Sequence, residues 1–277
     1  MLKTIIFSYL LSSLAFAQET TNIVRVSPER IGLVLVSETH DGFAIATDGA
    51  QFNADGTSSE VQKLFQVGKY GAIAFAGNVS IQDPVDRPVR EEVNVSRIAK
   101  SWLDSHPDAN LVTANAEINA LISQTLTKFF STRKPGARAG KYIFSLVSIG
   151  FIEGKELLTS TEYFVPLSKG KAPRADKGWV HLKRGGIWPK GSQRVLEELV
   201  SGNLPALKEF KAEPAVKKRH SSPAQSQSAQ DLIDFFDVIL RASESDEGKK
   251  LDRTAPIVTP PNRLAIVSEK DGFTWKK

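Results

Sequence analysis

The segment Ile31–Asn78 is IGLVLVSETHDGFAIATDGAQFNADGTSSEVQKLFQVGKYGAIAFAGN, and its pattern predicts two successive pairs of short β-strands. Its apolar runs are rich in Val, Ile, Phe and Ala, and most of these residue types favour strands. Between the runs lie Asp-Gly, Asn-Ala-Asp-Gly and Gly-Lys-Tyr-Gly, which favour tight turns. The four expected strands are Ile31–Val36, Phe43–Thr47, Lys63–Val67 and Gly71–Ala76.

Beyond Asn78 the apolar spacing changes from every second residue to the period of a helix, and two helices are expected before residue 133. Three further strands are expected at Tyr142–Glu153, Glu156–Pro166 and Gly178–Lys183. Two helices follow at Gly191–Ser201 and Ser228–Ala242, and two final strands at Arg263–Val267 and Phe273–Trp275. This order predicts an α+β fold, a four-layer αββα sandwich in which helices cover both outer faces of two antiparallel sheets.

The N-terminal segment Met1–Ala17 places one lysine before an apolar run and ends in Ala-Phe-Ala, as a cleavable signal peptide does. We therefore expect cleavage after Ala17 and a secreted or periplasmic protein without a stable membrane span. A retained anchor is the alternative, although the run is short against the ~20 residues that a spanning helix needs. Residues 18–277 are expected to form a single domain with an exposed loop at 212–227.

The chain contains no cysteine, which excludes disulfides, thiol nucleophiles and thiolate metal sites. Four histidines, His40, His106, His181 and His220, show no metal-ligand spacing. We therefore expect neither a metal nor another cofactor. No Gly-x-Ser-x-Gly motif supports a serine-hydrolase triad.

The formal net charge is +5, and the stretch Lys169–Lys190 holds seven basic residues against Asp176 alone. One interpretation is a surface for anionic polymers, since Trp179 and Trp188 lie among the lysines. The interpretation we favour is a solvated sheet edge on which lysines prevent aggregation. No nucleic-acid partner is expected.

Residue spacing in the first segment resembles that of proteasome-type N-terminal-nucleophile hydrolases, in particular the bacterial proteasome-like β-subunit relatives. These proteins show a DG-apolar-apolar-A-x-D second strand, a lysine that opens the third strand and an AG that ends the fourth. The matching residues are Asp41, Gly42, Ala46, Asp48, Lys63, Ala76 and Gly77. Asp231–Arg241, Ala255–Ile257 and Asp271–Trp275 resemble the C-terminal part of the same relatives.

The resemblance implies a hydrolase whose first mature residue supplies the nucleophile, with its own α-amine as general base. Lys63 would then tune the proton affinity of the reacting groups, Asp48 would hold Lys63, and the Gly77 N–H would stabilise the oxyanion. The substrate would be a peptide or related amide, and the assembly a homo-oligomer. Outside catalysis, Asp48 and Lys63 would form a salt bridge between strands, and Gly77 would serve a bend or a close backbone approach.

The sequence departs from this pattern at the nucleophile. The spacing places it at position 32, where the chain has Gly32 between Ile31 and Leu33, and none of these carries a hydroxyl or thiol. Cleavage after Ala17 would leave Gln18 as the first residue, fourteen residues before Gly32. Two hypotheses follow: an exported peptidase or amidohydrolase, or a non-catalytic, self-assembling scaffold with the same fold. A binding protein that uses Lys169–Lys190 is a third and weaker one.

Overall fold

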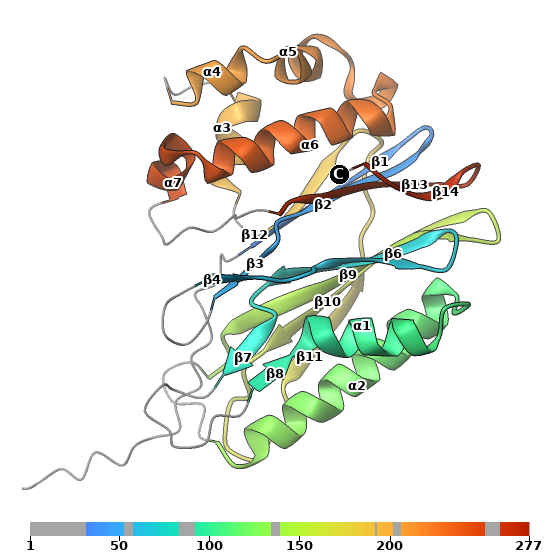
Figure 1. Ribbon diagram of the computed structural model, residues 1–277, viewed down its shortest axis with the longest axis vertical. Coiled ribbons are helices and arrows are strands. Elements are labelled where there is room, and N and C mark those ends of the chain that lie inside the picture. Colours follow the sequence, from blue (N-terminus) through green and yellow to red (C-terminus); the bar gives the residue numbers. More distant parts are fainter. Residues whose placement is uncertain are drawn as a thin grey trace, which may run out of the picture.

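The computed structural model describes residues 32–52, 58–82, 92–133, 139–191, 193–201, 206–252 and 261–276. Two five-stranded antiparallel sheets stack face to face, and helices cover both outer faces (Figure 1). The expected α+β four-layer sandwich is therefore confirmed. The expected signal peptide at 1–17 and the stretch Ala255–Ile257 lie outside the described residues.

The two sheets divide the long strands between them. In spatial order, the first sheet consists of β12 (Ile187–Gly191), β1 (Leu33–Thr39), β2 (Gly42–Thr47), β13 (Arg263–Ser268) and β14 (Gly272–Trp275). The second consists of β11 (Arg174–Trp179), β10 (Lys155–Phe164), β9 (Tyr142–Ile152), β6 (Gly71–Gly77) and β5 (Leu64–Val67). Two short pairs are β3 (Ala50–Phe52) with β4 (Ser58–Glu60) and β7 (Ser80–Gln82) with β8 (Glu92–Asn94).

The helices form the two outer layers. The second sheet is covered by α1 (Val95–Ser105) and α2 (Leu111–Ser131). The outer side of the first sheet carries α3 (Arg194–Ser201), α4 (Lys208–Lys211), α5 (Pro214–Ser221), the 3₁₀ turn η2 (Ala224–Ser226), α6 (Ala229–Glu244) and α7 (Asp246–Asp252). None of the helices in the described part of the chain is long and apolar enough to cross a membrane.

Alternating side chains in β1 and β2 explain why this sheet lies inside the sandwich. Val34, Val36 and Ile45 face the second sheet and form the central core with its strands. Their neighbours Leu35 and Ala46 face the opposite way and pack against α6. Because successive residues of a strand point to opposite sides, a fully apolar strand needs cover on both faces. The continuous apolar runs of the first segment thus place it between two other layers.

Two strands differ from their expected positions. The strand expected at Gly178–Lys183 overlaps β11 only at residues 178 and 179, because β11 begins at Arg174 and ends at Trp179. The strand β12 was not expected, because its sequence IWPKG contains Pro189, and proline disfavours a strand interior. It is tolerated here because β12 is an edge strand that pairs only with β1.

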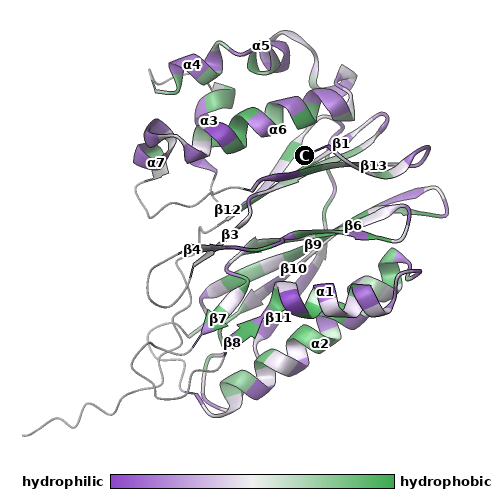
Figure 2. Cartoon of the chain, in the orientation of Figure 1, coloured by the Kyte–Doolittle hydropathy of each residue, from purple (hydrophilic) through white to green (hydrophobic). Residues whose placement is uncertain are grey.

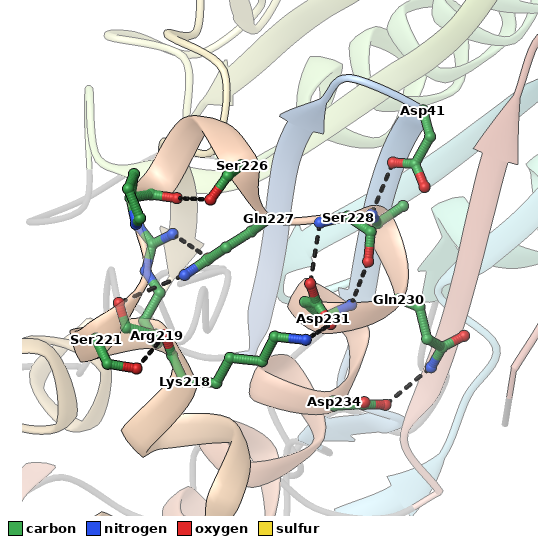
Figure 3. Close-up of polar contacts among 12 residues, drawn as sticks. Asp41, Lys218, Arg219, Ser221, Ser226, Gln227, Ser228, Gln230, Asp231 and Asp234 are labelled. Atoms are coloured by element: carbon green, nitrogen blue, oxygen red, sulfur yellow. Dashed lines mark hydrogen bonds and ion pairs between the residues drawn. The ribbon is translucent and has the colours of Figure 1, made fainter.

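The prediction of an exposed loop at 212–227 is wrong, because this segment contains the helix α5 and the 3₁₀ turn η2. Pro214 occupies the first turn of α5, where its missing N–H costs nothing. Figure 3 shows two contacts of the segment: Lys218 Nζ donates to Asp231 of α6 at 2.6 Å, and Arg219 donates to the buried Gln227 within the segment at 2.6 Å. Asp231 lies outside the segment, so part of what holds α5 in place is not encoded in the composition of 212–227.

Candidate functional site

Gly32 lies directly before β1 and is the centre of the candidate site. Its φ of +77° is a conformation that other residues rarely adopt. A Cβ built on Gly32 would lie 2.7 Å from Nζ of Lys63 and 3.3 Å from the backbone nitrogen of Gly77. A side chain at this position would therefore point directly into the group of residues that the sequence singled out.

Asp48 and Lys63 form a fully buried ion pair beside Gly32. Asp48 follows β2 and Lys63 precedes β5, so the pair connects the first sheet to the second. Lys63 Nζ lies 3.0 Å from Oδ2 and 3.2 Å from Oδ1 of Asp48, and both side chains are completely buried. The Leu33 N–H donates to Asp48 Oδ1 at 2.7 Å, which holds the start of β1 against the same carboxylate.

Gly77 ends β6 with a φ of +97°. A Cβ on Gly77 would lie 2.7 Å from the carbonyl oxygen of Ile143 and 2.8 Å from Cα of Phe144, so only glycine allows β9 to approach this closely. This close approach is the structural role expected for Gly77. The same geometry places its nitrogen next to Gly32, where the sequence predicted an oxyanion donor.

The fold thus brings Gly32, Asp48, Lys63 and Gly77 together, although they come from the ends of four different strands. The arrangement offers a buried positive charge and a backbone nitrogen around one position. It offers no hydroxyl or thiol at that position, because the residue there is glycine. The site therefore has the charged pair and the backbone nitrogen that would assist a nucleophile, but it has no nucleophilic side chain at position 32.

Tyr142 is a neighbour of the site that the sequence did not predict. Its hydroxyl donates to the Ala76 carbonyl at 3.2 Å and shares a hydrogen bond of 3.0 Å with Ser145 Oγ. Burial raises the pKa of Tyr142 well above its ordinary value, so the phenol stays neutral. Tyr142 also lines a cavity of about 660 Å³ together with Glu162 and Lys190. Nothing in the local sequence could reveal this, since Ala76 and Tyr142 are far apart in the chain.

Other residues of the sequence pattern serve the fold. Asp41 accepts hydrogen bonds from Thr39 Oγ1 at 2.7 Å and from the Ala229 N–H at the start of α6 at 2.8 Å. It therefore joins the β1–β2 turn to the N-terminus of α6 (Figure 3). Gly42 is required because a Cβ there would lie 2.4 Å from the carbonyl oxygen of Val267.

The basic stretch Lys169–Lys190 is divided between the two sheets. It includes β11, an exposed edge strand of the second sheet, and most of β12, an edge strand of the first. Lys190 is ion-paired with Glu162 of β10, a contact that joins the two sheets. Within the described ranges, no group of three His, Asp or Glu side chains is arranged to hold a metal ion.

These features together define a proteasome-like subunit fold: two antiparallel sheets between helical layers, with an Asp–Lys pair and a glycine amide at one end of the sandwich. Among solved structures, the helical assembly of the Anbu complex from Pseudomonas aeruginosa has this fold, with a TM-score of 0.52 and 14% identity over 88% of this chain and 84% of that one. Neither the protein-family models nor the curated proteins gave a match.

Two other Anbu structures align less well. Anbu (ancestral beta-subunit) from Yersinia bercovieri matches with a TM-score of 0.47 and 14% identity, over 88% of this chain and 86% of that one. The Anbu (Gly-1) mutant from Hyphomicrobium sp. strain MC1 matches with a TM-score of 0.46 and 10% identity, over 89% and 85%. The family predicted from the sequence is therefore wrong: the Pseudomonas aeruginosa structure that shares this fold is an Anbu protein, which is proteasome-like but belongs to a distinct family. Because the sequence identity is so low, the similarity shows a shared fold and no more than that.

Proposed function

We propose that this chain is a non-catalytic, self-assembling subunit with a proteasome-like fold. The observation that carries the proposal is Gly32, because the one position surrounded by the charged pair and the Gly77 nitrogen has no side chain. Cleavage directly before Gly32 would create a free α-amine there, but still no hydroxyl or thiol to attack a carbonyl.

A structural role accounts for the remaining site residues. The Asp48–Lys63 pair joins the two sheets from a fully buried position, and Asp48 also fixes the start of β1 through Leu33. Removing either charge would leave the other buried without its partner, which is costly. The pair therefore has a reason to be present in a protein that does not catalyse hydrolysis.

Assembly is supported by the fold. The Pseudomonas aeruginosa structure of this fold is a helical assembly of the Anbu complex. We infer that the present chain likewise forms a homo-oligomer. Analytical ultracentrifugation of the mature protein tests this directly: species larger than a single chain are expected, and a monomer at all concentrations would overturn the proposal.

The catalytic alternative makes a different prediction. The non-catalytic proposal predicts that a hydroxyl-directed covalent probe gives no labelling. It also predicts that a panel of peptide and acyl-amide substrates gives no turnover above a buffer control. Labelling at a Ser or Thr, or turnover that is lost in a folded Lys63→Ala variant, would instead establish a hydrolase.

Export belongs to the same proposal and rests on the segment Met1–Ala17. The intact mass of protein isolated from its native host is expected to correspond to a chain that begins at Gln18. A mass that includes Met1–Ala17 would show that this segment is retained.

A further inference from the structure

The outer face of α2 is unusual for a surface helix. Its 21 residues include only two charged side chains, Glu117 and Lys128. Exposed apolar residues lie on it, with Val112 at 53% and Leu121 at 37% of their full accessibility. Figure 2 shows α2 mostly in green and white, whereas α4 and α5 on the opposite side of the molecule are mostly purple.

The other face of α2 is firmly held by the second sheet. Ile118, Ile122 and Leu126 are fully buried in the core that α2 shares with this sheet. Tyr163 of β10 donates a hydrogen bond of 2.7 Å to the buried Asn119 side chain. The helix cannot rotate to hide its outer face, so the apolar residues there stay on the surface of a single chain.

Most of the exposed residues of α2 form one continuous stripe, and Val112 lies outside it. We call this the α2 stripe, and it consists of Thr113, Glu117, Ala120, Leu121, Gln124, Lys128 and Ser131. Their spacing of three and four residues places them on one side of a helix. The small side chains of Ala120 and the adjacent exposed Ala116 leave room for another helix to approach closely.

We propose that the α2 stripe is an interface for a second copy of this chain, with the two α2 helices antiparallel about a two-fold axis. The inference rests on the proposed self-assembly and names the surface that performs it. A two-fold interface brings the same patch of both copies together, so the patch must complement itself. The arrangement of charges on α2 meets this requirement.

The midpoint between Glu117 and Lys128 falls between Ile122 and Ser123. In an antiparallel pair centred there, each Glu117 faces Lys128 of the other copy, and this contact occurs twice. The same register places Leu121 opposite Gln124 and Ala120 opposite Thr125, so each apolar side chain at the centre meets an uncharged polar one. No like charges meet, and the two charged residues of each helix find opposite partners.

Glu117 also has a hydrogen-bond partner within its own chain. Its Oε2 accepts a hydrogen bond of 3.0 Å from Trp102 Nε1 of α1, which restrains the carboxylate on the α1 side of the stripe. The charges of α1 nearby pair with each other, since Lys100 Nζ lies 2.6 Å from Asp104 Oδ2. Lys128 is exposed near the other end of the stripe.

A charge-exchange experiment tests the proposal. Glu117→Lys alone and Lys128→Glu alone each place like charges opposite each other twice in a homodimer, so sedimentation should show at least tenfold weaker self-association. An equimolar mixture of these two variants should form the complex again, because every lysine then faces a glutamate. The double variant Glu117→Lys/Lys128→Glu should also associate as the original chain does.

Controls separate the interface from the fold and from assembly in general. Glu117→Gln keeps an acceptor for Trp102 while it removes the charge, and Trp179→Ala changes an exposed aromatic residue on β11. All variants should keep the original circular dichroism and Tm. If the original chain associates and both single variants associate equally well, the α2 stripe is not the interface, although the proposed function stands. A monomeric original chain would refute the proposed function itself.

Discussion

At the scale of single residues, the candidate site depends on a buried pair of charges. Lys63 and Asp48 are both fully buried and lie 3.0 Å apart at their closest atoms. Transfer of a single charge from water into a protein interior is strongly unfavourable unless an opposite charge and hydrogen bonds compensate it. Each member of the pair therefore depends on the other, whatever chemistry takes place beside them.

Replacement of Lys63 by Met tests this dependence. Lys63→Met is expected to lower the free energy of unfolding by about 3–5 kcal/mol, because the Asp48 carboxylate then lacks its buried cation. Lys63→Met combined with Asp48→Asn should cost less than the sum of the two single changes, since no uncompensated charge remains. Urea unfolding of the three variants measures this coupling. Additive losses would show that the two side chains act independently.

At the scale of elements, α6 is the helix whose beginning is best defined. Ser228 Oγ accepts from the Asp231 N–H at 3.2 Å, and Asp231 Oδ2 accepts from the Ser228 N–H at 3.1 Å, which completes a reciprocal cap. Asp41 from the β1–β2 turn accepts the next N–H, that of Ala229. A local motif and a long-range contact thus fix the same helix end (Figure 3).

Ser228→Ala should therefore destabilise the protein by about 1 kcal/mol, the usual cost of losing an N-cap side chain. Ser226→Ala is the matched control two residues away, since Ser226 Oγ donates to the Pro223 carbonyl within the 3₁₀ turn η2 and caps no α-helix. Its effect should stay within about 0.5 kcal/mol. Equal losses in both variants, measured by chemical denaturation, would contradict a specific capping role for Ser228.

At the scale of the whole molecule, the two sheets are joined at both ends by charged residues. Asp48–Lys63 and Glu162–Lys190 connect them through opposite charges. Glu38 of β1 lies beside Glu156 of β10, so here two like charges meet across the sheets. Burial and the neighbouring Glu156 raise the pKa of Glu38 above its ordinary 4.5, while Arg184 and His181 lower it by less.

This shift predicts how stability depends on pH. Because the pKa of Glu38 is higher in the folded state, its protonated form favours folding below pH 4.5, and this contribution is lost as the pH rises through the folded-state pKa. Glu38→Gln should therefore raise Tm at pH 7 and have little effect at pH 4. The exposed Glu209→Gln on α4 is the control, with no change at either pH. A lower Tm for Glu38→Gln at pH 7 would show that Arg184 dominates.

Much of the architecture followed from local patterns. The apolar runs of β1, β2, β5 and β6 and the helical periods of α1, α2 and α6 are properties of short segments. The four strands and α6 were predicted to within a few residues, and the helices α1 and α2 were predicted in number and order. The four-layer arrangement followed because a strand that is apolar on both faces must be covered on both. The family assignment failed because a few short-range spacings describe a fold shared by several families.

The amino-acid sequence alone determined most of the long strands and helices, and that position 32 lacks a nucleophile. Only the tertiary structure placed Gly32 against Lys63 and Gly77, formed α5 within the expected loop, and left the α2 stripe on the surface. The physical reason is the range of the interactions involved. Periodicity and turn preference act between neighbours in the chain, whereas ion pairs, close backbone approaches and helix covering join residues that the sequence separates widely.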